Sequence, residues 1–227
     1  MNEPRPHYHG HRDRLRARFA EAGGKGLADY EILELILFRA IPQRDVKPLA
    51  KLLLTRFGDL GRVCAARTDQ LTEIKGISEK VALELNLFQE VATRIAREQV
   101  TGRAVISSWS ALLDYVRTAL QNASTEEFRV LFLDKKNRLL ADEFQAHGTV
   151  DHAPVYPREI IKRAIALDAS AIILVHNHPS GDPTPSQADI EMTRQVVEIG
   201  RPLSIVVHDH LVVGRDKVAS FKQLGLM

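Results

Sequence analysis

Two histidines, His176 and His178, follow a short apolar segment and are separated by a single residue. The segment Ala171-Ile172-Ile173-Leu174-Val175 is short and rich in β-branched residues, which is typical of a buried strand. In an extended backbone, residues i and i+2 point to the same face. We therefore expect the two imidazoles to converge on one point at the end of this strand.

The residues after the histidines end the strand and return the chain toward the same point. The stretch from Pro179 to Pro185 is rich in proline and glycine and predicts a rigid turn. Ser186 then fits the N-cap of a helix, with Asp189 in its first turn. Two neutral imidazoles and one carboxylate leave an open position on tetrahedral Zn²⁺, as in catalytic sites. Each part also has a simpler interpretation, because His-x-His pairs are common and Asp189 fits a helix-capping carboxylate.

The full spacing, His-x-His-Pro followed by Ser-x-x-Asp, is more restrictive than its parts. It resembles the metal signature of the JAMM (MPN) metalloprotease family. In detail it resembles RadC-type proteins, which read His-Asn-His-Pro-Ser-Gly and then Pro-Ser-x-x-Asp, and every one of these positions matches here. The resemblance covers nearly the whole chain, including the start Gly-His-Arg-x-Arg-Leu. It implies an α/β, cytidine-deaminase-like domain with one Zn²⁺ per chain, held by His176, His178 and Asp189.

The resemblance also implies two catalytic side chains. Ser186 stands at the position of the serine that donates to the tetrahedral oxyanion, a role compatible with a helix N-cap. Glu126 stands at the position of the glutamate that acts as general base, just before a predicted strand. Glu127 would point to the opposite face of that strand, so only one of the two can face the metal, and Glu126 is favoured. Glu159 also matches a family motif, but carboxylates are favoured at a helix start in any case.

A second His-x-His pair, His208-Asp209-His210, lies between two segments predicted as strands. RadC-type proteins show Asp-His at this place, so Asp209 and His210 match the pattern. No partner carboxylate or serine stands at useful spacing, so we expect a strand-end pair near the active face and no second metal. An alternative role for Asp209 or His210 is to form hydrogen bonds to the metal ligands.

The chain changes character at Thr101-Gly102. Before this point the sequence predicts helices over 11–21, 30–38, 49–57, 60–66, 69–73 and 78–98. After it we expect helices over 108–120, 158–167 and 187–199 and strands over 127–133, 138–146, 171–175, 203–208 and 211–213. Residues 1–10 are predicted to be irregular, and Gly148, Thr149 and Pro154 interrupt the pattern. The prediction is an all-α domain over 1–102 followed by a mixed α/β domain over 103–227.

The segment 71–82 looks like a helix-hairpin-helix module, whose pattern places Ile-x-Gly-Ile-Gly ahead of a helix. Such hairpins direct backbone N–H groups and a helix N-terminus at one DNA phosphate, so binding is independent of sequence. Lys75, Gly76 and Lys80 are the residues best placed for a phosphate, and weak DNA binding is one expectation. Ser78 stands where the pattern has its second glycine, and an αα-hairpin packed within a helical domain fits the segment equally well.

Composition sets the remaining limits. A hydrophobic content of 44% and a charged content of 26% are those of an ordinary soluble globular protein, and a net charge of +2 indicates nothing about nucleic acid. No apolar run approaches the roughly 20 residues that span a bilayer, so no membrane partner is expected. The N-terminus shows no secretory signal, and the single Cys64 excludes an intramolecular disulfide framework. A cytoplasmic location is therefore expected.

Two functions of different classes follow. The first is a zinc-dependent metalloprotease or isopeptidase of the JAMM type that uses a metal-activated water. The second is a DNA-associated repair or recombination protein in which the zinc domain is a different hydrolase or a non-catalytic scaffold. The sequence identifies neither the peptide or isopeptide substrate nor the oligomeric state.

Overall fold

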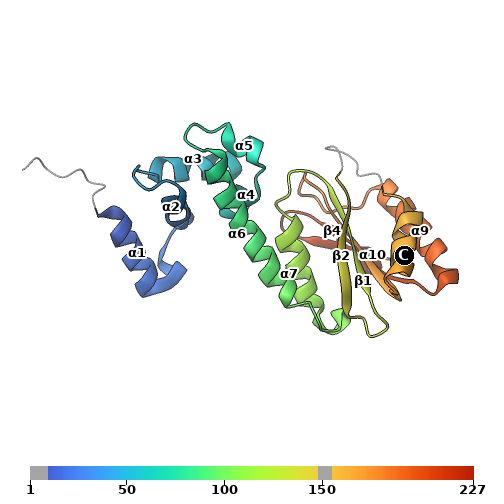
Figure 1. Cartoon of the computed structure of the whole chain (residues 1–227). Helices are drawn as coiled ribbons and strands as arrows, with labels where there is room; N and C mark the ends of the chain where they lie inside the picture. The colour runs from blue at the N-terminus through green and yellow to red at the C-terminus, as the bar shows by residue number, and fades with distance from the viewer. Residues whose placement is uncertain (1–9, 148–154) are drawn as a thin grey trace, which may run out of the picture. The chain divides into compact units, whose positions relative to one another are not determined.

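The computed structural model describes residues 10–147 and 155–227, which form two compact units along the chain (Figure 1). The first unit ends at Glu90 and the second begins at Val91, so the division falls within helix α6 (Glu79–Glu98). The boundary expected at residue 102 lies later, beyond the end of α6. The irregular residues 1–9 and the interruption at Gly148, Thr149 and Pro154 lie outside the described residues. None of the described helices is long and apolar enough to cross a bilayer.

The first unit is helical, as predicted. Its elements are α1 (His11–Ala22), η1 (Gly23–Gly26), α2 (Asp29–Ala40), α3 (Lys47–Phe57), α4 (Leu60–Ala65), α5 (Thr68–Thr72) and the first part of α6. One apolar core joins these helices, and it includes Leu15, Leu33, Leu37, Leu53, Leu71 and Leu85. Burial of these leucines, at about 1.5–3 kcal/mol for each side chain, is the main stabilisation of such short helices.

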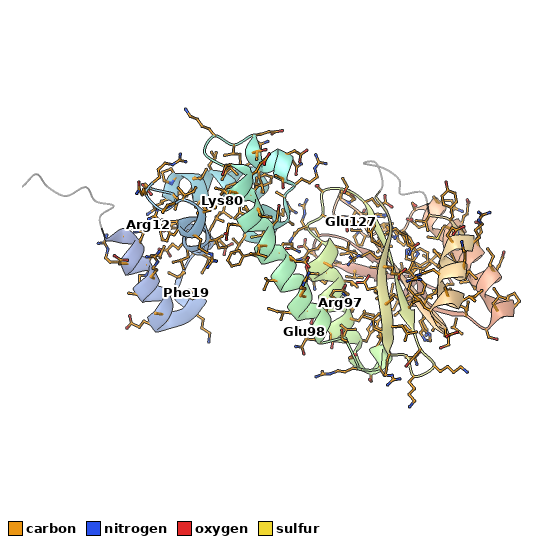
Figure 2. The ribbon with its side chains drawn as sticks, viewed as in Figure 1. Arg12, Phe19, Lys80, Arg97, Glu98 and Glu127 are labelled. Carbon is orange, nitrogen blue, oxygen red and sulfur yellow. The ribbon has the colours of Figure 1, made fainter. Side chains whose placement is uncertain are left out.

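Arg12 ties α1 to the end of α2; Figure 2 labels this side chain. Its guanidinium donates to the carbonyls of Ile41 and Arg44, both at 2.6 Å, and lies 4.4 Å from the ring centroid of Phe38. The last carbonyls of a helix lack intrahelical partners, and Arg12 satisfies carbonyls at and just beyond the end of α2. The arginine of the Gly-His-Arg motif therefore has a structural role in the first unit.

A glycine turn joins α5 to α6. The Ile77 N–H donates to the carbonyl of Ile74 at 3.0 Å, and Gly76 between them has φ +101°, a conformation that favours glycine. The guanidinium of Arg44 lies so close to Gly76 that an added Cβ would collide with it. Lys75 and Lys80 are both exposed, and Figure 2 labels Lys80 near the start of α6. A helix, a glycine turn and a second helix thus occupy the predicted segment.

The second unit is built on a five-stranded mixed sheet with the order β2-β1-β3-β4-β5. The strands are β1 (Glu127–Leu133), β2 (Leu139–His147), β3 (Ala171–Asn177), β4 (Val206–Val213) and β5 (Val218–Ser220). Strands β3 and β4 are parallel, and the other neighbours are antiparallel. The helices are η2 (Val105–Ser108), α7 (Trp109–Leu120), α8 (Pro157–Ala166), α9 (Gln187–Gly200), η3 (Arg201–Leu203) and α10 (Phe221–Leu224).

Helices cover both faces of the sheet. On one face, α7 shares a core with the strands through residues such as Leu112, Val116 and Leu131. On the other face, α8 and α9 share a second core, which includes Ile160 and Val196. The central strand β3 is buried along its whole length, which agrees with the apolar run over residues 171–175. The predicted fold class, a helical region followed by a mixed α/β domain, is confirmed.

The two strands predicted over 203–208 and 211–213 are wrong as separate elements. Leu203 ends η3, and Ser204 adopts a left-handed conformation with φ +57°. A single strand, β4, then runs from Val206 to Val213, so the second His-x-His pair lies inside a strand. The polar residues around Asp209 thus continue the strand that they were predicted to interrupt, and the pairing of β4 with β3 shifts register between Ile172 and Ile173.

Candidate metal centre

Three predicted ligands meet where β3 ends and α9 begins. His176 lies in β3, and His178 follows it directly, with its N–H donating to the carbonyl of Val213 at 3.0 Å. The two Nε2 atoms are 3.1 Å apart. Asp189, in the first turn of α9, places Oδ1 3.4 Å from His176 Nε2 and Oδ2 3.6 Å from His178 Nε2. The strand geometry and the helix start therefore bring together the residues chosen from their spacing.

These donor atoms fit a zinc ion. Tetrahedral Zn²⁺ with bonds of ~2.0–2.1 Å separates its ligand atoms by roughly 3.3–3.4 Å. The observed separations of 3.1, 3.4 and 3.6 Å scatter around that value. His176 is fully buried, whereas the His178 side chain is 19% exposed, so one side of the group is open to solvent. Two imidazoles and a carboxylate thus leave an accessible side, as a catalytic site requires.

A main-chain carbonyl orients His178. Its Nδ1 lies 2.8 Å from the carbonyl oxygen of Asp182, in the turn between β3 and α9. A carbonyl only accepts, so Nδ1 carries a proton, and Nε2 is left as the nitrogen available to a metal. Residues of this turn pack closely against Gly214. A Cβ at position 214 would collide with the Gly181 carbonyl and with Pro183. The position of His178 therefore depends on a glycine at the end of β4.

The electrostatics of the group favour a cation. Burial of the Asp189 carboxylate acts to raise its pKa, but the neighbouring imidazoles of His176 and His178 outweigh it and hold that pKa well below its usual range. Contact with Asp189 raises the pKa of His178, and the charge of Glu126 acts in the same direction. An ionised carboxylate therefore faces the point on which the imidazoles converge, and a second negative charge acts on His178.

Glu126 and Glu127 lie just before and at the start of β1. The charge of Glu126 acts to raise the pKa of His178, and Glu127 is the first residue of β1 (Figure 2). Asn177, between the two histidines, fixes the backbone of this segment through two hydrogen bonds. Its buried amide accepts from the N–H of Glu127 at 2.8 Å and donates to the carbonyl of Thr125 at 3.1 Å. Asn177 therefore holds the chain on both sides of Glu126.

Ser186 caps α9 and also contacts a ligand. Its Oγ accepts from the N–H of Asp189 at 3.2 Å and donates to Asp189 Oδ2 at 2.6 Å. The Asp189 carboxylate accepts in addition from the Ser186 N–H at 2.8 Å, which completes a capping box. Capping and a position beside the metal ligands thus coincide in one residue, as expected.

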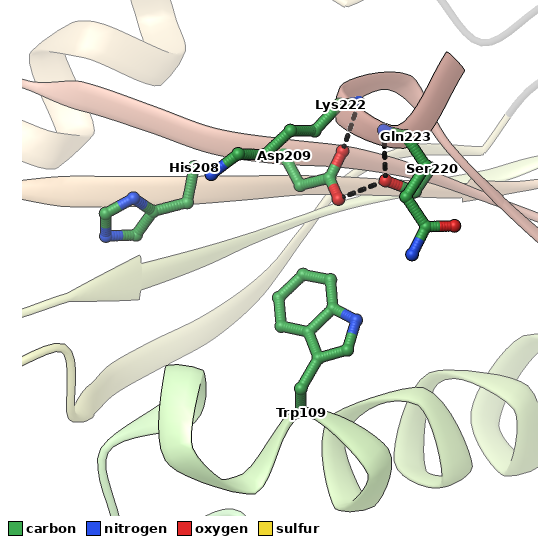
Figure 3. A pocket seen from close by; sticks show the side chains of 6 residues that line it. All are labelled: Trp109, His208, Asp209, Ser220, Lys222 and Gln223. Carbon is green, nitrogen blue, oxygen red and sulfur yellow. Dashed lines mark hydrogen bonds between the residues drawn. The ribbon is translucent and has the colours of Figure 1, made fainter. Parts of the chain in front are cut away.

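The second His-x-His pair divides between the two faces of the sheet. His210, expected at a strand end, lies inside β4, and its Nε2 contacts His176 Nδ1 at 2.7 Å. Asp209 points to the face covered by α7, where it accepts from Ser220 Oγ at 2.5 Å and from the Lys222 N–H at 3.1 Å (Figure 3). A cavity of about 220 Å³ separates Asp209 from Trp109. Asp209 is therefore a structural anchor of β4, away from the metal ligands.

Several residues at the centre were not predicted to belong to it. Thr193 lies between Asp189 and His210, and its spacing of four residues from Asp189 on a helix was the signal that could have identified it. Phe128 stacks on the His176 ring, with centroids 5.9 Å apart. Glu159, by contrast, pairs with Arg158 and Lys162 on α8, in agreement with its interpretation as a helix-start carboxylate.

Comparison with known proteins adds a family context. A family model described as a RadC-like JAB domain matches residues 106–226, and one described as UPF0758 N-terminal matches residues 9–83. A UPF0758 protein from Rhodobacter capsulatus is 59% identical over 213 residues, which cover 94% of this chain and 100% of that protein. A UPF0758 protein from Ruegeria pomeroyi is 55% identical over 217 residues, which cover 96% of this chain and 97% of the relative.

Proposed function

The chain belongs to the UPF0758 family and carries a RadC-like JAB domain, and from this premise we propose that it is a zinc-dependent hydrolase of the JAMM type. The bond that we propose it cleaves is a peptide or isopeptide bond. One observation carries the proposal: the donor atoms of His176, His178 and Asp189 converge at zinc-ligand spacing.

Zn²⁺ held by these three residues would supply a Lewis acid that polarises the scissile carbonyl and acidifies water. Glu126 accepts a proton from the attacking water, and the water oxygen forms a bond to the carbonyl carbon. When the C–N bond breaks, Glu126 returns that proton to the leaving amine. Ser186 donates a hydrogen bond to the tetrahedral oxyanion. In the described structure this hydroxyl donates to Asp189, so it must rotate toward the substrate to take that role.

Metal content and a base substitution test the proposal. Protein purified without added chelator should contain about one zinc per chain, and Asp189→Ala should contain little. Incubation with a peptide library followed by mass spectrometry should detect cleavage by the wild type and none by Glu126→Gln. Glu127→Gln is the matched control and should remain active. Full activity of Glu126→Gln would show that another group is the base, and cleavage by fully zinc-depleted protein would refute the metal chemistry.

The substrate can be sought with the same variant. Glu126→Gln keeps the three metal ligands and loses the carboxylate that accepts the proton, so it should hold uncleaved substrate longer than the wild type. Proteins that are captured by Glu126→Gln and released by competition with wild-type protein are candidates. Capture that also persists with Asp189→Ala would be independent of the metal centre.

We also propose, as a second function, that the first unit binds nucleic-acid phosphate at the turn between α5 and α6. The observation that favours it is the Arg44 guanidinium against Gly76, which adds a cation to the exposed Lys75 and Lys80. A turn of this kind contacts phosphate without reading bases, so affinity should fall steeply with salt. Arg44→Gln and Lys75→Gln should each weaken binding to a duplex of arbitrary sequence. Absence of binding by the wild type at low salt would remove this proposal.

A further inference from the structure

A chain of hydrogen bonds runs behind His176, on the side away from the metal position. His176 Nδ1 lies 2.7 Å from His210 Nε2, and His210 Nδ1 lies 2.7 Å from Thr193 Oγ1. Thr193 Oγ1 in turn donates to the main-chain carbonyl of Asp189 at 2.6 Å. The chain thus starts at one predicted ligand and ends on the backbone of another, and the proposed mechanism assigns no role to His210 or Thr193, which lie between them.

The direction of each hydrogen bond follows from chemistry. A carbonyl oxygen only accepts, so the single hydroxyl proton of Thr193 points to Asp189. The Thr193 oxygen must then accept from His210, which requires a proton on His210 Nδ1. Neutral His210 consequently has a bare Nε2, which accepts from Nδ1–H of His176. With both imidazoles neutral, this is the one arrangement in which all three contacts are hydrogen bonds, and it leaves His176 with a lone pair on Nε2.

Packing keeps this arrangement intact. His176, His210 and Thr193 are fully buried, so water does not compete for their polar atoms. The His210 ring stacks on Phe221 with centroids 4.5 Å apart, and its edge meets Phe128 at 5.7 Å. Rotation of the imidazole would break both ring contacts as well as both hydrogen bonds. His210 and Thr193, on the side of His176 away from the metal position, therefore fix the orientation of its ring.

We propose that Thr193 and His210 are positioning residues that fix the Nδ1–H tautomer of His176 and thereby set the affinity of the centre for zinc. The inference rests on the proposed metal centre and goes beyond it, because it assigns the source of ligand orientation. A metal-ligating histidine needs a bare nitrogen toward the metal, and the partner of its other nitrogen selects that tautomer. If the Thr193 hydroxyl is removed, His210 can carry its proton on either nitrogen, and the selection is lost.

Substitutions at Thr193 separate this role from simple packing. Thr193→Val keeps the shape and removes the hydroxyl, whereas Thr193→Ser keeps the hydroxyl. Thr118→Val is the matched control, because Thr118 makes the same contact with the carbonyl four residues before it, on α7. Zinc affinity of the full-length chain is measured by competition with a chelator. Removal of such a partner typically costs 10–100-fold in affinity, so Thr193→Val should bind zinc at least tenfold more weakly than Thr193→Ser and Thr118→Val.

A second readout does not depend on metal or activity. Imidazole ¹H–¹⁵N spectra of the zinc-free protein, recorded at a pH where the buried histidines are neutral, report which nitrogen of His176 carries the proton. The wild type and Thr193→Ser should show Nδ1–H, and Thr193→Val should show a mixture. If Thr193→Val does not fold, the same comparison uses His210→Gln, whose amide can accept and donate, against His210→Leu.

The outcomes separate the inference from the proposed function. Equal zinc affinity and an unchanged His176 tautomer in Thr193→Val would overturn the inference, even if the enzyme cleaves amides. A tenfold loss in Thr193→Val with retained affinity in Thr193→Ser supports it, even if no amide substrate is found. A wild-type chain that binds no zinc would refute the proposed function, and the tautomer spectra would then decide the orientation by themselves.

Discussion

Replacement of Asn177 by alanine should loosen the segment that carries Glu126 and leave the metal ligands in place. The Asn177 side chain is buried, and its two hydrogen bonds hold the N–H of Glu127 and the carbonyl of Thr125. A buried polar group left without a partner costs about 1–3 kcal/mol. Thr125 is half-buried and can recover part of its hydrogen bonding from water, so we expect a net loss near the cost of one group, about 2 kcal/mol.

Amide hydrogen exchange tests this expectation locally. A loss of about 2 kcal/mol corresponds to roughly 30-fold faster exchange of the Glu127 amide, since 1.4 kcal/mol is a factor of ten. Zinc affinity should change little, because Asn177 points away from the face that holds His176. Asn122→Ala, in the turn after α7, is the control and should alter exchange by less than twofold. Unchanged protection of the Glu127 amide in Asn177→Ala would refute the view that Asn177 holds this segment.

Three further predictions concern the metal, the turn and the cysteine. Zinc added to chelated protein should raise the thermal unfolding midpoint in a concentration-dependent way, and Asp189→Ala should abolish the rise. Gly214→Ala should lower stability by ~1–3 kcal/mol in denaturant titrations and weaken zinc binding, because the new Cβ would collide with Gly181 and Pro183; normal affinity would show that the turn adapts. Burial raises the pKa of the Cys64 thiol to about 11, so Cys64 should resist thiol reagents at pH 8 until the protein unfolds. Because the folded pKa is the higher one, its stabilising contribution is complete below pH ~9 and is lost between about pH 9 and 11, which pH-dependent urea unfolding would detect.

The sequence predicted which side chains meet at the candidate metal centre because these residues are local in the chain. His176, His178, Ser186 and Asp189 lie within one strand, one turn and one helix start, so the periodicity of the strand and the capping pattern of the helix were sufficient. The choice of Glu126 depended on a resemblance, since no local pattern relates it to a strand some fifty residues later. In the structure the charge of Glu126 acts to raise the pKa of His178.

The contacts behind the ligands could not be predicted in the same way. His210 reaches His176 because β4 lies parallel to β3 in the sheet, and that pairing is a property of the whole fold. The strand containing His210 was predicted as two strands with His210 between them, whereas β4 is continuous from Val206 to Val213. In the sequence, nothing about Asn177 indicates that it forms hydrogen bonds to a distant segment. These bonds form because the antiparallel pairing of β3 with β1 places Thr125 and Glu127 beside Asn177.

Strand β4 presents Asp209 to one face of the sheet and His210 to the other. Because this alternation has a period of two, deletion or insertion of a single codon before Asp209 would exchange the two side chains between faces. The carboxylate would then lie behind the metal ligands, and the imidazole would lie among the hydroxyl and amide groups near α10. Substitutions at one position can be compensated by a neighbour, but such a shift harms both faces at once. We expect natural variation in length among relatives to spare this strand and to collect in the loops around it.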